Sequence, residues 1–402
     1  MIPQDGGFAQ LKFRDPARGK ALAGELERLA REIGREPITL MHVCGSHEQA
    51  IARFGLRASF PPSVDLIMGP GCPVCVTDLP EVDEAVALAK SGVRVATYGD
   101  MLKVPGRVLS LADAKSEGAK VDVVYSVSQA VDLARSTNDE VVFFSTGFET
   151  TAVATAAVIL SPDRPKNLSV LSAHKYILPA MEIVAEIPGT RIEGFLGAGH
   201  AAAITGWGIF EPFAAKYNRP VVVAGFEPLD ILAGLVKLLE LVRDGRAEVA
   251  NMYPRCVTRE GNLRAQEQLW RVFETEGGEW RGIAFVPDGN LRIRDEFADA
   301  DARRRFEIDV TSLWTTAPSE LAKDCICGAI LSGLAGPHDC PMFGKECLPD
   351  RPIGACMVSS EGACRIWHQY GGRPDLRTLT PQPPLPSPPT LPHRERGSEV
   401  SL

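Results

Sequence analysis

The sequence predicts an α/β protein in which parallel sheets are covered by helices. Short apolar runs rich in β-branched residues recur along residues 38–224, and helical patterns lie between nearly all of them. This alternation is typical of parallel sheets, because parallel strands need a crossover connection. Most of the runs also end in a polar, glycine-rich turn. Such turns gathered at one edge indicate a shared ligand-binding site.

The expected elements follow one another in a regular order. The chain begins with an amphipathic helix over residues 16–35, expected to pack on another part of the protein. Beyond residue 228, two apolar helices are expected at residues 229–243 and 263–274, followed by a poorly patterned segment. Strands are expected at residues 38–43, 64–68, 93–97, 121–126, 141–145, 168–172, 191–196 and 220–224, with intervening helices that include 81–90, 128–135, 149–160 and 178–186.

Two arrangements of these strands are compatible with the pattern. They could close into a single β/α barrel, or they could form two open sheets in tandem, divided near residues 136–139. Periodicity alone does not separate the two arrangements.

The composition limits the classes of function. The chain has 402 residues, 45% hydrophobic and 23% charged, as expected for a globular protein of about two or three domains. A formal net charge of -8 argues against nucleic acid as the main partner. We find no signal-peptide pattern and no apolar run long enough to span a membrane, so we expect a cytoplasmic protein. Ten cysteines in a reducing compartment indicate metal or redox roles.

The most informative stretch is Met41–Glu48, in which an apolar strand stops at Cys44 and a helix follows. The helix dipole and the free amides at a helix N-terminus favour a thiolate, which is the nucleophilic and metal-binding form of cysteine. His47 and Glu48 add a possible ligand or base and a carboxylate. The alternative is that Cys44 is a buried small apolar residue.

A second motif, GPGCPVC, contains Cys72 and Cys75. Two cysteines separated by two residues can form a redox-active dithiol or half of a zinc site. In the second case Cys44 and His47 could complete the zinc site. A purely structural role is the third possibility.

The C-terminal region contains the cysteines of a predicted metal site. Zinc or an iron–sulfur cluster would suit these thiolates, and their unpaired spacing favours iron–sulfur. The alternative is that they are unrelated buried thiols. They are Cys325, Cys327, Cys340, Cys347, Cys356 and Cys364.

Other polar residues near strand ends have two interpretations. His174 and His200 could point into the shared cleft or be buried structural histidines. Glu149 and Glu227 could be cleft carboxylates or helix caps. Cys256 stands alone and is expected in the core.

Taken together, the motifs CGSHE, GPGCPVC, TYGDMLKVPG, GFETT and GFEPLDIL resemble those of the HypD family of hydrogenase maturation proteins. The spacing C-x14-C-x6-C-x16-C on the C-terminal cysteines also matches, and the resemblance covers about residues 8–370. It implies a scaffold that, with a small HypC-like partner, holds iron while cyanide and carbon monoxide ligands are assembled for nickel–iron hydrogenase. A HypE-like protein would deliver the cyanide. An exposed cleft around Cys44 would be the docking site of the small partner.

The resemblance also implies roles for individual residues. Cys44 would bind the mononuclear iron, His47 and Glu48 would shape its surroundings, and Cys72 with Cys75 would be the redox pair. Cys327 and Cys356 would be additional thiols. A 4Fe–4S cluster would be held by Cys325, Cys340, Cys347 and Cys364.

For the fold, the resemblance implies two tandem Rossmann-like parallel-sheet domains and a C-terminal iron–sulfur domain. The expected bounds are 1–36 for an N-terminal helix packing on the C-terminal domain, 37–136 and 137–228 for the α/β domains, 229–371 for the cluster domain, and 372–402 for a disordered proline-rich tail.

Two other functions are alternatives, and the sequence disfavours the second of them. In an iron–sulfur thiol oxidoreductase, Cys72 and Cys75 would exchange electrons with a small substrate bound by Cys44. A nucleotide-dependent enzyme is disfavoured, because neither G-x-G-x-x-G after a strand nor G-x-x-x-x-G-K-[ST] is present.

Overall fold

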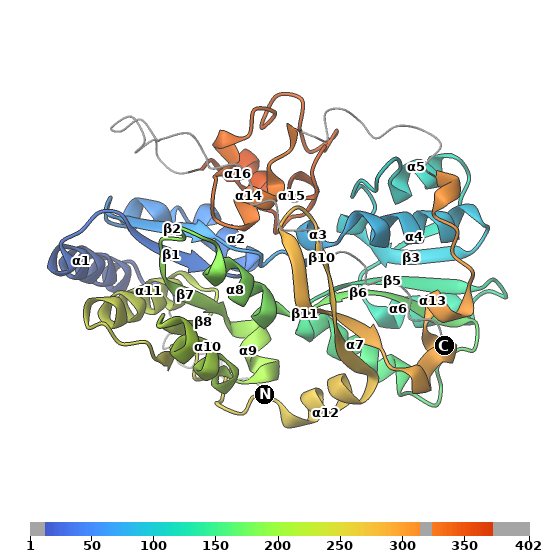
Figure 1. Ribbon diagram of the computed structural model, residues 1–402, viewed down its shortest axis with the longest axis horizontal. Helices are drawn as coiled ribbons and strands as arrows, with labels where there is room; N and C mark the ends of the chain where they lie inside the picture. Colours follow the sequence, from blue (N-terminus) through green and yellow to red (C-terminus); the bar gives the residue numbers. More distant parts are fainter. Residues whose placement is uncertain (1–12, 314–323, 373–402) are drawn as a thin grey trace, which may run out of the picture. The chain divides into compact units, whose positions relative to one another are not determined.

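A computed structural model describes residues 13–313 and 324–372 of the chain. The expected proline-rich tail lies, apart from its first residue, outside the described residues. Within them the protein is a mixed α/β structure with two sheets rather than one closed barrel (Figure 1).

The first sheet is entirely parallel. Its strand order is β2-β1-β7-β8-β9, so β1 lies between β2 and β7. The strands are β1 (Ile38–His42), β2 (Val64–Met68), β7 (Ile192–Ala198), β8 (Val221–Ala224) and β9 (Val249–Asn251).

The second sheet is mixed. Its order is β10-β11-β6-β5-β3-β4, with parallel pairing from β6 to β4 and antiparallel pairing of β11 with both β6 and β10. The strands are β3 (Arg94–Tyr98), β4 (Val121–Val124), β5 (Val141–Gly147), β6 (Leu168–Lys175), β10 (Phe273–Trp280) and β11 (Ala284–Ile293).

The two sheets interleave along the chain instead of following one another. The chain leaves the first sheet after β2, builds β3 to β6 of the second sheet, and returns for β7 to β9. The expected division at residue 136 therefore does not separate the sheets. Each strand was identifiable from local sequence, whereas its sheet depends on packing between distant segments.

The helices confirm the main periodic patterns. Asp15 caps the first helix by accepting hydrogen bonds from two amides, and Gly34 ends it with φ 69°. The helices include α1 (Pro16–Ile33), α2 (Gly45–Arg53), α3 (Pro73–Val76), α4 (Leu79–Lys90), α5 (Leu111–Ser116), α6 (Val127–Arg135), α7 (Glu149–Ile159), α8 (Ile177–Glu186), α9 (Gly199–Thr205), α10 (Phe210–Tyr217), α11 (Pro228–Arg243), α12 (Leu263–Val272), α13 (Ala302–Arg305), α14 (Cys327–Leu331), α15 (Ala355–Val358) and α16 (Ala363–Tyr370), with 3₁₀ turns such as η1 (Leu56–Ser59) and η4 (Asp295–Ala300).

The first sheet carries a different core on each face. Ile38 and Leu40 belong to a core with α1 and α11, whereas Met41 and Val43 belong to a core shared with the C-terminal cysteines. Helix α11 packs on β7 and β8, and α1 packs on α11. The N-terminal helix thus contacts the beginning of the predicted C-terminal domain, at a helix that covers the first sheet.

The C-terminal segment lies against the two motif-bearing turns. Helix α16 contacts α2, and α15 contacts α3, although these pairs are far apart in sequence (Figure 1). Among the described residues, none of the helices combines the length and apolar character needed to cross a membrane.

Candidate functional site

The centre of the site lies where β1 ends and α2 begins. Cys44 is the N-cap residue of α2 and has an extended backbone (φ -154°, ψ 125°), as the strand–turn–helix pattern predicts. His200 lies shortly after the end of β7, in the first turn of α9 (Gly199–Thr205), two residues beyond the N-cap Ala198. Because β1 and β7 are neighbouring parallel strands, their carboxyl ends bring Cys44 Sγ within 3.9 Å of His200 Nδ1. The structure thus places His200 beside Cys44.

The surroundings of Cys44 correct two expectations. Cys44 is only 2% exposed, so the exposed cleft expected around its sulfur is not found among the described residues. Burial raises the pKa of the Cys44 thiol to about 12, and the charge of Glu361 acts in the same direction. Hydrogen bonds from the backbone of His47 and Ser46 lower the pKa by less. The polypeptide alone therefore favours the thiol, and a thiolate requires an additional positive charge next to the sulfur.

Glu48 is a buried carboxylate that joins the Cys44 turn to the C-terminal segment. Its Oε2 accepts hydrogen bonds from His42 Nε2 at 2.8 Å and Arg57 at 2.6 Å. Its Oε1 accepts from Arg57 at 2.8 Å and from the indole N–H of Trp367 at 2.7 Å. Burial acts to raise the pKa of Glu48, but Arg57 and His42 hold it well below its usual range. Since Trp367 and Cys364 share α16, Glu48 links the CGSHE turn to a predicted cluster ligand.

His47 connects α2 to the GFEP turn that follows β8. Its Nε2 lies 3.0 Å from the carbonyl oxygen of Gly225, and its ring centroid lies 4.8 Å from that of Phe226. Burial lowers the pKa of His47 to about 3, so the ring is neutral and Nε2–H donates to the carbonyl. His47 therefore holds the GFEP turn against α2.

The GPGCPVC motif lies directly against the backbone of the Cys44 turn. Gly45 N donates to Gly71 O at 3.0 Å, and a Cβ on Gly71 would lie 2.2 Å from the amide nitrogen of Cys44. Only glycine permits this approach. Cys72 and Cys75 are buried and form a disulfide, with Cys72 at the N-cap of α3. In this oxidised form the pair has no thiolates to offer zinc.

Glu149, from the GFETT motif, is a buried carboxylate at the start of α7. Its Oε1 accepts a hydrogen bond from Ile177 N at 3.0 Å, while Oε2 is buried with no partner among the described residues. Burial raises the pKa of Glu149 to about 6, and the nearby His200 acts in the opposite direction. Glu149 and His200 are thus close enough to interact electrostatically beside Cys44.

The remaining polar candidates have structural contacts. His174 Nε2 lies 2.8 Å from Ser145 Oγ inside the second sheet. Glu227 is the N-cap residue of α11 and forms an ion pair with Arg14, which favours the helix-cap interpretation. Cys256 is exposed, so its prediction as a core residue is wrong.

The C-terminal cysteines gather in one apolar cluster with Cys72 and Cys75. Cys325 Sγ and Cys327 Sγ are 3.2 Å apart. Hydrogen bonding from Cys327 and Cys356 lowers the pKa of Cys364. The thiols of Cys325 and Cys347 also act electrostatically on Cys364. Two neighbouring residues connect the predicted ligands Cys325 and Cys347, because Ile353 N donates to Cys347 Sγ at 3.4 Å and Gly354 lies against Cys325 Sγ.

The donor set fits an iron–sulfur cluster in two respects. A Cβ on Gly354 would lie 2.5 Å from Cys327 Sγ and 2.6 Å from Cys325 Sγ, so glycine leaves the backbone close to the sulfurs. Cys340, Cys347 and Cys364 are buried in the same apolar core, with Cys325 packed against it, so the surroundings of all four predicted ligands are poorly solvated. In the described part of the chain, no three His, Cys, Asp or Glu side chains are arranged to hold a single metal ion. A cluster spreads its thiolates over several iron atoms, so this result does not count against it.

Three residues of this region have no recognisable signal in the sequence. Glu361 accepts a hydrogen bond from Ser46 Oγ at 2.6 Å and acts on Cys44, yet it lies in a loop more than 300 residues away. Trp367 contacts Glu48 across 319 residues, and Arg281 contacts Val76 across about 200 residues. Only the folded chain brings them to the site.

Comparison with known proteins identifies similar chains. A family model described as "HypD: Hydrogenase formation hypA family" matches residues 18–371. The chain is 44% identical over 373 residues to "Hydrogenase maturation factor HypD" of Azotobacter vinelandii, covering 90% of this chain and 96% of that protein. It is 40% identical over 369 residues to the protein of the same name from Rhodobacter capsulatus, covering 90% and 97%. The Cupriavidus necator protein of that name is 41% identical over 377 residues, covering 91% and 97%.

Proposed function

Because the chain belongs to the HypD family of hydrogenase maturation factors, we propose that it is the scaffold on which the iron of nickel–iron hydrogenase receives its cyanide and carbon monoxide ligands. The observation that carries the proposal is the Cys44 thiol, held between His200 and the GPGCPVC turn at the carboxyl edge of the first sheet. A single soft sulfur donor at such an edge suits iron that carries cyanide.

In this proposal the iron is cargo, and Cys44 is its ligand on this chain. The positive charge of the iron replaces the thiol proton that the buried environment otherwise retains. Because Cys44 is buried, the iron reaches it only when neighbouring residues move aside, and Glu361, which packs on Gly45 and accepts from Ser46, is a candidate for this movement. A small HypC-like partner supplies further iron ligands, and a HypE-like protein delivers cyanide. The free cysteines of the chain suit the cytoplasm, where thiols remain reduced.

The redox part of the proposal rests on the other cysteines. Cys325, Cys340, Cys347 and Cys364 would hold a 4Fe–4S cluster, which supplies one-electron transfer when bound. The Cys72–Cys75 disulfide takes up two electrons and two protons to become a dithiol. Helix α15 contacts α3, so the cysteine-rich segment and the disulfide are neighbours in the fold.

Substitution of Cys44 tests the proposal. The C44A variant, co-expressed with the small partner and purified anaerobically, should lose one iron per chain and fail to support hydrogenase maturation, while its acid-labile sulfide is unchanged. The matched control is C256A, because Cys256 is an exposed cysteine outside the sequence motifs, and this variant should retain both properties. Unchanged iron and maturation in C44A would remove Cys44 as the iron ligand.

A second candidate function is an iron–sulfur thiol oxidoreductase acting on a small substrate. The observation that favours it is the buried Cys72–Cys75 disulfide beside the cysteine-rich segment. The two functions differ in one measurable respect, because only the scaffold holds iron beyond that of the cluster.

A further inference from the structure

The β10–β11 hairpin carries a cationic residue, Arg281, to the boundary between the disulfide and the cysteine-rich segment. On the basis of the proposed function, we propose that the positive charge of Arg281 raises the reduction potential of the iron–sulfur group held by this segment. The contacts of the hairpin support this role step by step.

The tip of the hairpin extends beyond the sheet. Strand β11 pairs with β6 only through Asn290 and Leu291, whereas β10 and β11 remain paired as far as Trp280 and Ala284. Figure 1 shows the two strands rising from the second sheet. The turn at residues 281–283 therefore projects away from the sheet.

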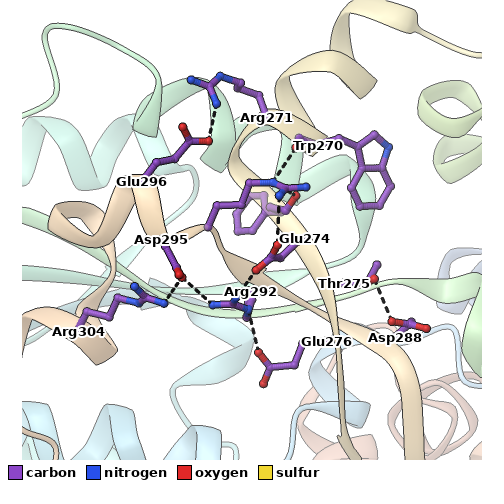
Figure 2. Close-up of polar contacts among 12 residues, drawn as sticks. Trp270, Arg271, Glu274, Thr275, Glu276, Asp288, Arg292, Asp295, Glu296 and Arg304 are labelled. Atoms are coloured by element: carbon purple, nitrogen blue, oxygen red, sulfur yellow. Dashed lines mark hydrogen bonds and ion pairs between the residues drawn. The ribbon is translucent and has the colours of Figure 1, made fainter.

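The base of the hairpin is held by a network of ion pairs (Figure 2). Arg292 of β11 pairs with Glu274 of β10 and, at 3.1 Å, with Asp295 of η4. Asp295 also pairs with Arg304. Thr275 Oγ1 donates to Asp288 Oδ1 at 3.0 Å. An exposed ion pair contributes only about 0–1 kcal/mol, but a network built onto a β-ladder fixes the direction of the ribbon.

The tip is anchored by packing. Trp280 is completely buried, and its ring centroid lies 6.0 Å from that of Phe148. Gly282 has φ 70°, and a Cβ on Gly328 would lie 1.7 Å from the carbonyl oxygen of Gly282. The turn therefore presses against the residue that follows Cys327.

The backbone of Arg281 contacts the other redox motif as well. Arg281 N donates to Val76 O at 3.1 Å, one residue after Cys75. Its guanidinium donates to the carbonyl oxygen of Pro105, in the TYGDMLKVPG motif. Arg281 thus contacts the end of α3 through its own amide, and its neighbour Gly282 contacts the first turn of α14.

The charge of Arg281 is not balanced by an ion pair. Within residues 13–313 and 324–372 no salt bridge joins Arg281 to a carboxylate, although Asp78 acts on its charge from farther away, and the buried Nε of Arg281 has no hydrogen-bond partner there. The groups that act on it electrostatically are Cys327, Asp78, Cys325 and Cys356. Three of these four are thiols of the cysteine-rich segment.

An unpaired guanidinium at this position suits a site that becomes negatively charged. A cluster ligated by thiolates is anionic, and reduction adds one more negative charge. A fixed positive charge in a poorly solvated environment stabilises the reduced form more than the oxidised form. Removing that charge should therefore shift the reduction potential to a more negative value.

The test compares variants of the full chain, purified anaerobically, in an EPR-monitored redox titration. R281M should shift the midpoint potential of the cluster to a more negative value than that of the wild type, and R281Q should shift it in the same direction. R281K, which keeps the charge, should stay close to the wild type. The matched control is R271M, because Arg271 pairs with Glu296 at the exposed base of the ribbon and its loss should have no effect.

Each outcome decides a different claim. Equal potentials for R281M, R281Q and the wild type would overturn the role of Arg281, as would an R281K shift as large as that of R281M. A wild-type chain without iron and sulfide would instead refute the iron–sulfur part of the proposed function. Circular dichroism shows whether each variant is folded. If R281M is not folded, the comparison is made with R281Q instead.

Discussion

The substitution Glu48→Gln tests how strongly the CGSHE turn is joined to the C-terminal segment. The side chain of Glu48 is completely buried, and that of its ion-pair partner Arg57 is 10% exposed. The hydrogen-bond partners of both carboxylate oxygens are all donors, from Arg57, His42 and Trp367. The glutamine side chain has one oxygen that can still accept hydrogen bonds, but its NH₂ group replaces the second oxygen and faces side chains that are themselves donors.

The expected cost follows from these contacts. The substitution leaves the guanidinium of Arg57 nearly buried without its counter-charge, and removing one partner of a buried ion pair costs about 3–5 kcal/mol. In Trp367→Phe the carboxylate keeps its other donors, so only one hydrogen bond to a charged group is lost, at a cost of about 1.5–3 kcal/mol. The free-energy changes of Glu48→Gln and Trp367→Phe should not add up in the double variant, because both substitutions affect the same hydrogen bond.

Urea unfolding followed by circular dichroism gives the required free energies. The matched control is Glu117→Gln, since the side chain of Glu117 is 50% exposed and pairs with Lys90 at the surface. It should change the free energy of unfolding by less than about 1 kcal/mol. If Glu48→Gln were no more destabilising than Glu117→Gln, the buried network would not join the two segments as described.

The remaining predictions concern stability and use the same unfolding measurement. Burial lowers the pKa of His174 to about 3, below the unfolded value, so this residue contributes stability that is complete above about pH 6.5 and is lost as the pH falls towards 3. His174→Gln should therefore reduce the pH dependence of the free energy of unfolding by up to about 1.4 kcal/mol per pH unit between about pH 6 and 4, and an unchanged slope would contradict this. Gly328→Ala should cost about 1–3 kcal/mol or more, because the new Cβ meets a backbone carbonyl at 1.7 Å that no rotamer change can relieve. Gly24→Ala, with open space around its Cβ, should be neutral or stabilising by about 0.5–1 kcal/mol, and similar results for both glycines would refute the close contact. Replacing Cys72 and Cys75 together by alanine should cost no more than about 2 kcal/mol through lost chain restraint, since the cysteines are only 3 residues apart, and a loss of more than about 4 kcal/mol would show that the disulfide has a larger structural role.

The elements of this fold were largely predictable because they depend on local patterns. Apolar runs ending in glycine-rich turns predicted β1 and the position of Cys44 at the N-cap of α2. The assignment of strands to sheets was not predictable in this way, because β1 pairs with β7 across some 150 residues. Whether a chain returns to its first sheet depends on contacts between segments that are far apart in the sequence.

The site was predictable only where its residues lie in motifs. Cys44 and the Cys72–Cys75 pair are both next to strand ends, so their positions follow from sequence. The raised pKa of Cys44 depends on its burial in the folded chain and on the charge of the distant Glu361. Arg281 occurs in an ordinary hairpin turn, and the role proposed for it rests on contacts that only the folded chain shows, between Arg281 and α3 and between Gly282 and α14.

The most direct test of the scaffold is the number of iron atoms and acid-labile sulfides per chain, on protein purified anaerobically with its small partner. The proposal predicts iron in excess of sulfide by about one, because a mononuclear iron on Cys44 adds to an iron–sulfur cluster with equal amounts of both. Equal amounts of iron and sulfide would contradict the scaffold and favour the thiol oxidoreductase. Zinc in place of iron would contradict the iron–sulfur cluster itself.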